Sequence, residues 1–241
     1  MSHGPPAEIR SFSFGDPAGE LVGTASAWAG GFCSSFGGPF EVEGSDPGEE
    51  WRLTGDGFEL TFAPVGEPGE LELADAGISA LYQLAHVRGT VTIDGEARAV
   101  DGAGQRSRRM GAPDGKRFGS LRAVSGWFGE EDGLALLAVR PRRARGHDSE
   151  LLAAVLIEGG VAVRVTEPRL SSTYTSDGAP ARVGLELWIG EEDAEQYPRR
   201  AAGETLGRSL LCDDSLRAEL LRLRMRGREG TGLYELVQSR Q

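Results

Sequence analysis

The chain lacks asparagine altogether, and its 241 residues include two cysteines and three histidines. Without asparagine there is no acceptor for N-glycosylation. The histidines, His3, His86 and His147, are scattered, whereas a zinc site needs clustered ligands, so no metal is expected. The cysteines, Cys33 and Cys212, are expected to be reduced thiols in a cytoplasmic protein, although the sequence does not show whether they pair.

Long hydrophobic runs are also missing. No segment approaches the ~18 apolar residues of a membrane span, and the first eight residues have neither the apolar stretch nor the basic run of a signal peptide. The formal net charge is −11, from 26 basic and 37 acidic residues. Nucleic-acid-binding proteins show the opposite balance, and an anionic bilayer repels such a charge. We therefore expect a cytoplasmic protein that binds neither nucleic acid nor membrane; its oligomeric state stays open.

The usual catalytic and cofactor signatures are absent. The sequence has no phosphate-binding loop and no Gly-x-Ser-x-Gly nucleophile elbow, and the 102–107 segment lacks the third glycine of a dinucleotide fingerprint. No cofactor is therefore expected. Cys33 could be a nucleophile, but no histidine or helix start lies near it to lower its pKa. We prefer to interpret it as a small apolar residue in a glycine-rich turn.

Glycine, by contrast, is abundant. The chain has 36 glycines and 12 prolines, so glycine is at about twice its usual share of roughly 7 %. Because 39 % of the residues are hydrophobic, the chain can still bury a core. Extra glycine in a folded chain indicates many turns between short strands, which disfavours a helical bundle.

Alternating apolar and polar residues predict a series of β-hairpins with glycine-containing turns. The pairs are 51–54 with 58–62, 87–93 with 96–100, 151–157 with 161–165, and 220–226 with 231–237, and a further strand covers 185–189. Short helical turns are predicted at 75–82 and 213–220. This pattern is typical of a sandwich or a barrel, whose interior can hold a ligand.

The glycine- and arginine-rich stretch 102–119 separates two strand-rich portions of similar length. We therefore expect a flexible N-terminus (1–10), an N-terminal half (11–111) and a C-terminal half (112–241).

Arginines are distributed unevenly. Residues 106–145 carry a net charge of +6, which leaves −17 for the rest of the chain. These arginines either form an anion-attracting surface or pair with the surplus carboxylates across neighbouring strands. A second row repeats at every other residue and shares one face of a strand: Arg222, Arg224, Arg226 and Arg228. It is either a solvated outer face opposite Glu186 or Glu235, or the mouth of a pocket for a carboxylate or phosphate.

The order of several short segments resembles the lipocalin-like superfamily of carotenoid hydratases (hydroxyneurosporene synthases) and lipocalin-like Diels–Alderases, which has bacterial members. The segments are 11–17, 21–25, the Tyr82-Gln83 pair, 87–96, 100–106 and 199–204. The resemblance covers most of the chain. It implies an all-β fold of two lipocalin-like barrel or sandwich halves with short helical turns, and an apolar ligand pocket.

One motif of that superfamily is altered in this chain. The Gly-x-Gly-x-Arg run normally continues as Asp-His-Ser-Trp-Gly, and its frame is kept by Gly102, Gly104, Arg106 and Gly111. The positions between are Ser107, Arg108, Arg109 and Met110. An arginine stays charged and cannot replace the acid and imidazole in proton transfer. We therefore do not expect the relatives' chemistry at this site.

These observations favour a protein that binds an apolar small molecule, such as an isoprenoid, a fatty acid or a polyketide, and the arginines would suit a ligand with an anionic end. The candidate ligand-binding residues are Arg106, Arg108, Arg109, Tyr82, Trp127 and Trp188, although core packing also accounts for the tryptophans. No catalytic residue is assigned. One alternative is a hydratase- or cyclase-type enzyme on a terpenoid or polyketide, with Asp101 or Asp114 supplying the proton. The other is a structural or interaction protein whose pocket is filled by side chains.

Overall fold

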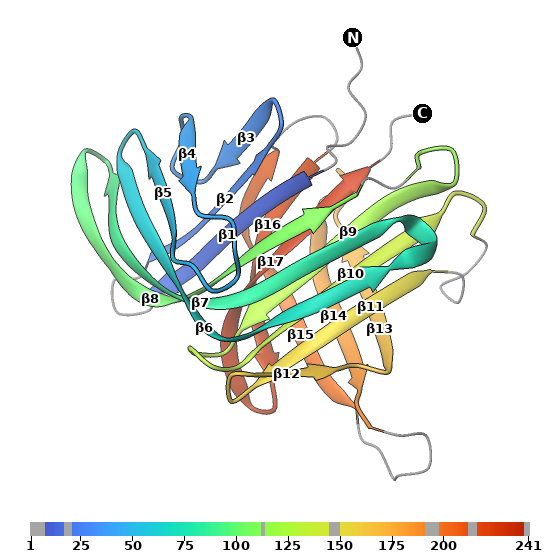
Figure 1. The fold of residues 1–241 in the computed structure, drawn as a ribbon. Helices are drawn as coiled ribbons and strands as arrows, with labels where there is room; N and C mark the ends of the chain where they lie inside the picture. Colours follow the sequence, from blue (N-terminus) through green and yellow to red (C-terminus); the bar gives the residue numbers. More distant parts are fainter. Residues whose placement is uncertain are drawn as a thin grey trace.

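The computed structural model describes residues 8–16, 21–111, 114–144, 150–190, 198–211 and 216–238. Within these ranges, seventeen strands form two antiparallel sheets, and the one helical element is a 3₁₀ turn at Ala74–Ala76 (Figure 1). The predicted all-β fold is therefore confirmed.

The first sheet contains eight strands in the order β3-β2-β1-β8-β7-β6-β5-β4. Their bounds are β1 (Glu8–Asp16), β2 (Leu21–Trp28), β3 (Gly31–Ser34), β4 (Phe40–Glu43), β5 (Trp51–Gly55), β6 (Phe58–Leu73), β7 (Ile78–Ile93) and β8 (Glu96–Met110). The sheet begins at Glu8, so residues 8–10 of the N-terminus that was expected to be flexible belong to a strand.

The second sheet contains nine strands in the order β12-β11-β10-β9-β17-β16-β15-β14-β13. Their bounds are β9 (Phe118–Trp127), β10 (Gly133–Pro141), β11 (Leu151–Glu158), β12 (Val161–Arg164), β13 (Glu167–Tyr174), β14 (Pro180–Trp188), β15 (Arg199–Leu211), β16 (Leu216–Met225) and β17 (Arg228–Gln238).

All four predicted hairpins are present, because their turn residues adopt the left-handed backbone that such turns need. Asp94 and Gly95 have φ of 54° and 82° between β7 and β8. Arg226 and Gly227 have φ of 52° and 76° between β16 and β17. The predicted strand at 185–189 lies mostly in β14.

Three local predictions are wrong. The helical turn expected at 75–82 ends at Ala76, and β7 begins at Ile78. Residues 216–220 of the second expected turn belong to β16, where every other side chain packs into a core; residues 213–215 lie outside the described residues. Cys33 is disulfide-bonded rather than a free thiol. Cys212, the only other cysteine of the chain, lies outside the described ranges.

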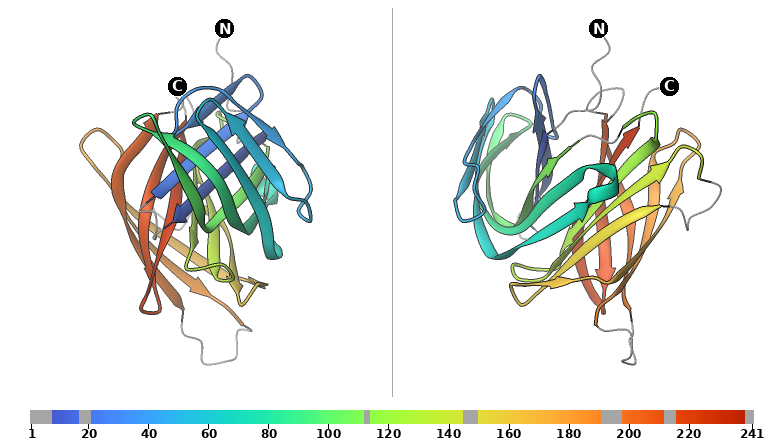
Figure 2. Two further views of the ribbon diagram at one scale, coloured as in Figure 1. Left: turned by 90° about the vertical axis from the view of Figure 1, so that its left-hand side faces the viewer. Right: turned by 45° about the vertical axis from the view of Figure 1, so that its right-hand side comes forward.

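Each sheet curls around its own core (Figure 2). The concave face of the first sheet is aromatic, and the Phe12 ring meets those of Trp51 and Phe62 edge-on at 5.7 and 5.4 Å. Phe32 and Phe40 close the seam between the terminal strands β3 and β4, with ring centroids 6.0 Å apart. The core of the second sheet is mainly aliphatic, and β11 contacts β13 across its seam.

A further core lies between the two sheets. Ile9, Leu71 and Tyr82 of the first sheet pack there against Trp127 and Val155 of the second. The long strands β6 and β7 extend beyond their own curl and cover β10 and β11, as Figure 1 shows. This overlap creates the groove described next.

Candidate functional site: a groove between the two sheets

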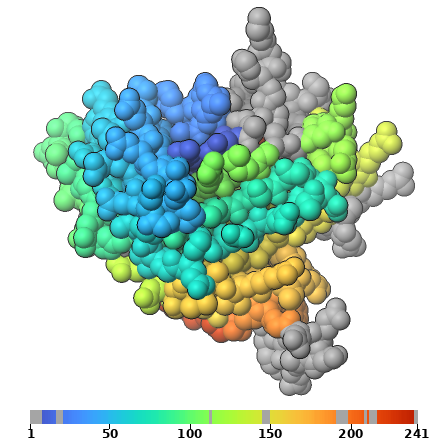
Figure 3. Space-filling model, viewed as in Figure 1, coloured from blue at the N-terminus to red at the C-terminus, as the bar shows by residue number. Residues whose placement is uncertain are grey.

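A half-open groove of about 1000 Å³ lies where the two sheets overlap. One side is formed by β6, β7 and the end of β8, and the other by β11, β12 and the start of β13. Figure 3 shows the face of the molecule on which these elements meet. Most lining residues are apolar, namely Pro47, Trp51, Pro68, Leu71, Ala80, Leu81, Met110, Leu152, Ala153, Ala154, Val155, Ala162, Val165 and Pro168.

The β4–β5 loop, residues 44–50, forms one end of the groove through Ser45, Asp46 and Pro47. The loop is braced from within. The amides of Ser45 and Asp46 donate to Glu49 Oε2 at 3.3 and 3.4 Å, and the indole of Trp51 donates to the Asp46 carbonyl at 3.0 Å. This end of the groove therefore has a defined shape.

Two guanidinium groups line the groove, one from each sheet. Arg108 of β8 donates to Glu8 Oε1 at 3.1 Å, and Arg10 contacts the same oxygen at 3.0 Å. The hydrogen bond from Arg10, with a further contribution from Arg108, lowers the pKa of Glu8. Two positive charges therefore share one carboxylate. Arg164, at the end of β12, is exposed and forms no ion pair within the described residues.

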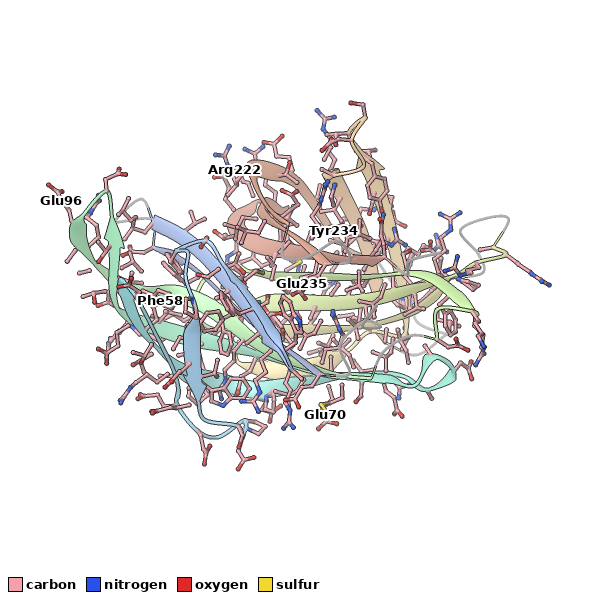
Figure 4. All side chains as sticks on the ribbon, turned by 90° about the horizontal axis from the view of Figure 1, so that it is seen from above. Phe58, Glu70, Glu96, Arg222, Tyr234 and Glu235 are labelled. Atoms are coloured by element: carbon pink, nitrogen blue, oxygen red, sulfur yellow. The ribbon has the colours of Figure 1, made fainter. Side chains whose placement is uncertain are left out.

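Three carboxylates also lie in the lining: Asp46, Glu70 and Glu72. Glu70 is on β6 in the row that continues through Leu81 to Arg108, and it is labelled in Figure 4. Glu72 lies in the next row, beside Ser79 and Met110. The groove therefore has a mixed lining, in which apolar side chains alternate with polar groups and charges of both signs.

The three predicted arginines of β8 have three different environments. Arg108 lies in the groove, whereas Arg106 is fully buried inside the curl of the first sheet, with its guanidinium 4.5 Å from the centre of the Trp51 ring. Arg109 points to the opposite face of the strand and lies between the sheets, 3.5 Å from Glu235 Oε2. Burial lowers the pKa of Arg109, and Glu235 opposes that shift.

The predicted aromatic residues do not line the groove. Tyr82 is buried between the sheets, where its hydroxyl donates to the Gly126 carbonyl at 2.9 Å, and burial raises the pKa of that hydroxyl. Trp127 packs in the same core. Trp188 lies apart on β14, with Arg169 5.9 Å from the centre of its ring. Of the six candidate residues, Arg108 alone is in the groove lining.

The glycines of the altered motif have a structural explanation. A Cβ atom on Gly104 would lie 2.4 Å from the Ser13 carbonyl oxygen, and one on Gly102 would lie 2.5 Å from that of Gly15. Gly111 has φ of 87°. Close approach of β1 to β8, together with this turn, therefore requires the glycine frame independently of any chemistry.

The second arginine row is a paired outer face, as one of the two interpretations predicted. Arg222 is labelled there in Figure 4. Each arginine of the row has a carboxylate partner. Arg222 lies 4.0 Å from Glu204, and Arg224 lies 2.7 Å from Glu229. Arg226 lies 2.9 Å from Glu158, and Arg228 lies 2.5 Å from Asp132. Neither Glu186 nor Glu235 is among these partners. Leu221, Leu223 and Met225 face the core of the second sheet.

A buried polar cluster lies at the seam of the second curl, and no pattern in the sequence indicated it. Arg122 of β9 pairs with Glu150 and donates to Ser172 Oγ at 3.4 Å. The Tyr234 hydroxyl lies 3.1 Å from both Ser172 Oγ and the Tyr174 hydroxyl. Because Glu150 precedes β11 and Ser172 lies on β13, Arg122 ties together the two sides of the seam. These contacts account for the cluster as a closure of the seam.

The candidate proton donors of the enzyme alternative lie outside the groove. Asp101 is exposed and contacts His86 Nε2 at 2.7 Å, whose Nδ1 contacts Glu130 at 2.8 Å. Asp114 is exposed and accepts the Lys116 amide at 2.9 Å. Within the described ranges, no group of histidine, cysteine and acidic residues is arranged to hold a metal ion. The same part of the chain contains no helix that is long and apolar enough to cross a membrane.

Comparison with known proteins supports the fold. No family model matches the sequence, and no curated protein does. Among solved structures, CghA with Sch210972 has 13 % identity and a TM-score of 0.55, covering 97 % of this chain and 89 % of that one. CghA alone gives 14 % and 0.56 over the same shares. A candidate AttH from Nitrosomonas europaea gives 13 % and 0.59, over 95 % and 92 %. These likenesses establish for this chain the fold of a lipocalin-like barrel protein.

Proposed function

We propose that this protein binds an apolar small molecule with an anionic end in the groove between its two sheets. The observation that carries the proposal is the groove itself, which has a volume of about 1000 Å³, many apolar side chains in its lining and a guanidinium on each side. Ligand sites are typically concave, apolar and about 300–1,000 Å³ in volume, with a few polar groups that fix orientation. Fatty acids and isoprenoid phosphates have the matching chemistry.

Arg108 and Arg164 have different roles in this proposal. Arg164 has no carboxylate partner among the described residues, so its guanidinium is available to a ligand anion. Arg108 shares Glu8 with Arg10, so that cluster keeps an excess positive charge. Carboxylates and phosphates form charge-assisted hydrogen bonds with guanidinium groups, which are stronger than neutral ones. Glu70 and Glu72 oppose an anion placed on the β6 side, which favours the end nearer Arg164.

The packing of the two cores favours the groove over the barrel interiors as the binding site. Aromatic rings fill the first curl, and aliphatic side chains fill the second. We propose binding and not catalysis, because the acid and imidazole of the related motif are replaced by Ser107 and Arg108 and neither Asp101 nor Asp114 lines the groove. The halves 11–111 and 112–241 are proposed as two units that share one site.

The compartment is a separate prediction. The sequence led us to expect the cytoplasm, but the disulfide at Cys33 opposes that expectation, because cytoplasmic thiols are normally kept reduced. We therefore propose that the protein works in an oxidising compartment.

The test uses two pairs of probes, each with the same apolar part and a different end: hexadecanoic acid with hexadecanol, and farnesyl diphosphate with farnesol. Binding is measured by titration with tryptophan fluorescence, since Trp51 lines the groove, and by native mass spectrometry. We expect the wild-type chain to prefer the anionic member of at least one pair. Arg164→Gln should weaken the binding of that member about tenfold, the value of one charge-assisted hydrogen bond at a partly exposed site. Arg108→Gln should weaken it less, because Arg108 is paired with Glu8.

Arg224→Gln is the matched control, because Arg224 is an exposed arginine on the outer face, paired with Glu229. It should leave the affinity for both members of each pair unchanged. The proposal fails if no probe binds the wild-type chain. The anionic end is refuted separately if acid and alcohol bind equally well and neither groove variant changes their ratio.

A further inference from the structure

Arg106 is the largest charged side chain in the core of the first sheet, with a relative exposure of 0 %. Every nitrogen of its guanidinium donates to a neutral oxygen. Nε and Nη2 both contact Gln83 Oε1, at 3.3 and 2.7 Å. Nη1 donates to the Glu49 carbonyl at 2.5 Å and approaches that of Phe62 at 3.5 Å. Burial lowers the pKa of Arg106 to about 10, with the Glu49 carboxylate opposing the shift, so the group is charged at neutral pH.

Most of these acceptors belong to the loop that ends the groove. Nη2 also donates to the Pro47 carbonyl and lies 3.5 Å from that of Asp46, so Arg106 reaches three carbonyls of residues 44–50. Asp46 and Pro47 line the groove, as does Trp51, against which the guanidinium stacks. Arg106 itself is not in the lining. It therefore contacts the back of the loop, and a ligand would contact the front.

Contacts from Arg10 and the backbone conformation of Gly44 also support the loop. Arg10 donates to the Gly44 carbonyl at 3.2 Å, and its guanidinium lies 5.7 Å from the centre of the Trp51 ring. Gly44 has φ of 94°, and a Cβ atom there would lie 2.7 Å from Trp51 Cδ1. Among these contacts, Arg106 alone joins the loop to the central strand β8.

We propose that Arg106 is a positioning residue, which holds the 44–50 loop from inside the first sheet and thereby fixes the end wall of the groove. For its effect on ligands, this inference depends on the function proposed above. Because its donors are already occupied by carbonyls and by Gln83, Arg106 recognises no ligand anion. Its loss should change the shape of the groove without changing the preference for charge, which separates it from Arg108 and Arg164.

The first test needs no ligand. Amide hydrogen exchange is measured by NMR for Ser45, Asp46 and Glu49 in Arg106→Lys and Arg106→Ala. Lysine keeps the charge but cannot reach three carbonyls and Gln83 together. We expect these amides to exchange at least tenfold faster in both variants, while strand amides of the second sheet keep their wild-type rates. Arg88→Lys, at an exposed arginine of the neighbouring strand β7, is the control and should leave the loop unchanged.

Chemical rescue distinguishes a local support from a general loss of stability. Guanidinium ion at about 20 mM should slow exchange of the loop amides in Arg106→Ala by refilling the vacated site, and methylammonium at the same concentration should not. If Arg106→Ala does not fold, Arg106→Lys carries the test. The proposal is overturned if the loop amides keep their wild-type rates in Arg106→Lys, or if exchange rises equally across both sheets.

The second test uses the acid and alcohol pairs. Arg106→Lys should weaken the binding of the acid and of the alcohol by the same factor. The ratio of the affinity for the acid to that for the alcohol should therefore stay within about twofold of wild type, whereas Arg108→Gln lowers that ratio. A loss confined to the acid would make Arg106 an anion-binding group and overturn the positioning role. If the wild-type chain binds no probe, the function proposed above fails, and the exchange experiment still decides whether Arg106 supports the loop.

Discussion

Asp132 shows how one carboxylate can tie three hairpins together. It lies between β9 and β10 and accepts a hydrogen bond from Arg228 Nη1, at the start of β17, at 2.5 Å. Its other oxygen accepts the Gly159 amide, in the β11–β12 turn, at 3.1 Å. The hydrogen bond from Arg228 lowers the pKa of Asp132 below its ordinary value of 3.8, and that from Gly159 adds to the shift. At 29 % exposure of the side chain, the contribution to stability is modest.

A depressed carboxyl pKa predicts the sign of a pH dependence. The stabilisation from Asp132 is present above the unfolded value near 3.8 and is lost as the pH falls through the lower folded value. Asp132→Asn should therefore reduce the free energy of unfolding by about 0.5–1 kcal/mol at pH 7, and the difference should shrink towards pH 2. Urea unfolding at both pH values measures it. Asp75→Asn, at an exposed carboxylate of the 3₁₀ turn, is the control; a difference that grows on acidification would contradict the assignment.

At this scale the sequence predicted the types of residue better than their positions. Arg106, Arg108 and Arg109 are near neighbours in the chain, but side chains alternate along a strand. This alternation sends Arg106 and Arg108 to one face of β8 and Arg109 to the other, where it lies against Glu235. Both faces of β8 are covered, so the sequence offered no polar side to indicate which arginine was buried. Arg164 could not be singled out, because its place in the groove lining depends on segments that are distant in the sequence.

The strand β8 shows how glycine permits a tight element. Gly102 and Gly104 lie on one face of β8 where β1 is its antiparallel neighbour, and the carbonyl oxygens of Gly15 and Ser13 occupy the space that side chains would need. Gly104 is also close to Val87, whose Cγ2 would be 2.7 Å from an added Cβ. The surrounding atoms at Gly104 are backbone and a core side chain, which cannot move aside cheaply.

This crowding predicts a large effect from one methyl group. Gly104→Ala should lower the free energy of unfolding by about 1–3 kcal/mol, the usual cost of overpacking a core. Gly119→Ala is the matched control, because Gly119 is also in a strand, yet its nearest neighbour would be 3.8 Å from the added Cβ. Thermal and urea unfolding of both variants measure the effect. Equal stabilities of the two variants would show that β1 can shift away from β8 without cost.

Elements were predictable where the turn chemistry was local. The Asp94-Gly95 turn and its flanking alternation were sufficient to predict the hairpin of β7 and β8. The last hairpin was also predicted, but it turns at 226–227, and residues 228–230, which were expected in the turn, belong to β17. The full length of β6 was not predictable, because Pro64, Gly66 and Pro68 are residues that usually mark the end of a strand. The strand instead continues to Leu73 through a register shift between Val65 and Gly69. The expected helix at 213–220 failed because the leucine spacing fits both a helix and a strand with two covered faces.

At the scale of the whole molecule, the two sheets meet through an apolar part and a polar part. Near β6 and β11 the contact is aliphatic and aromatic. Between β1, β2 and β17 it is polar, and Glu235 accepts hydrogen bonds from Ser11 Oγ at 2.6 Å and Ser26 Oγ at 3.3 Å, beside the Arg109 guanidinium. Figure 4 shows Glu235 between the sheets. Composition predicted two β-rich halves, but the way they dock, and therefore the groove, depends on surfaces from distant segments.

The Arg109–Glu235 pair gives a test of this docking. Both side chains are about 7 % exposed or less, and removing one partner of a buried ion pair typically costs about 3–5 kcal/mol because a buried charge is left uncompensated. Glu235→Leu should lower the free energy of unfolding more than Arg109→Met. Glu235 keeps its two serine donors when Arg109 is removed, whereas Arg109 has no other carboxylate partner in the described chain.

The double variant should recover at least half of the larger loss of stability, since two apolar side chains can replace the ion pair. A double-mutant cycle on the free energy of unfolding measures this coupling, with Arg224→Met and Glu229→Leu on the exposed face as the control cycle. Additive losses in the Arg109–Glu235 cycle would mean that water, rather than the pair, compensates these charges between the sheets.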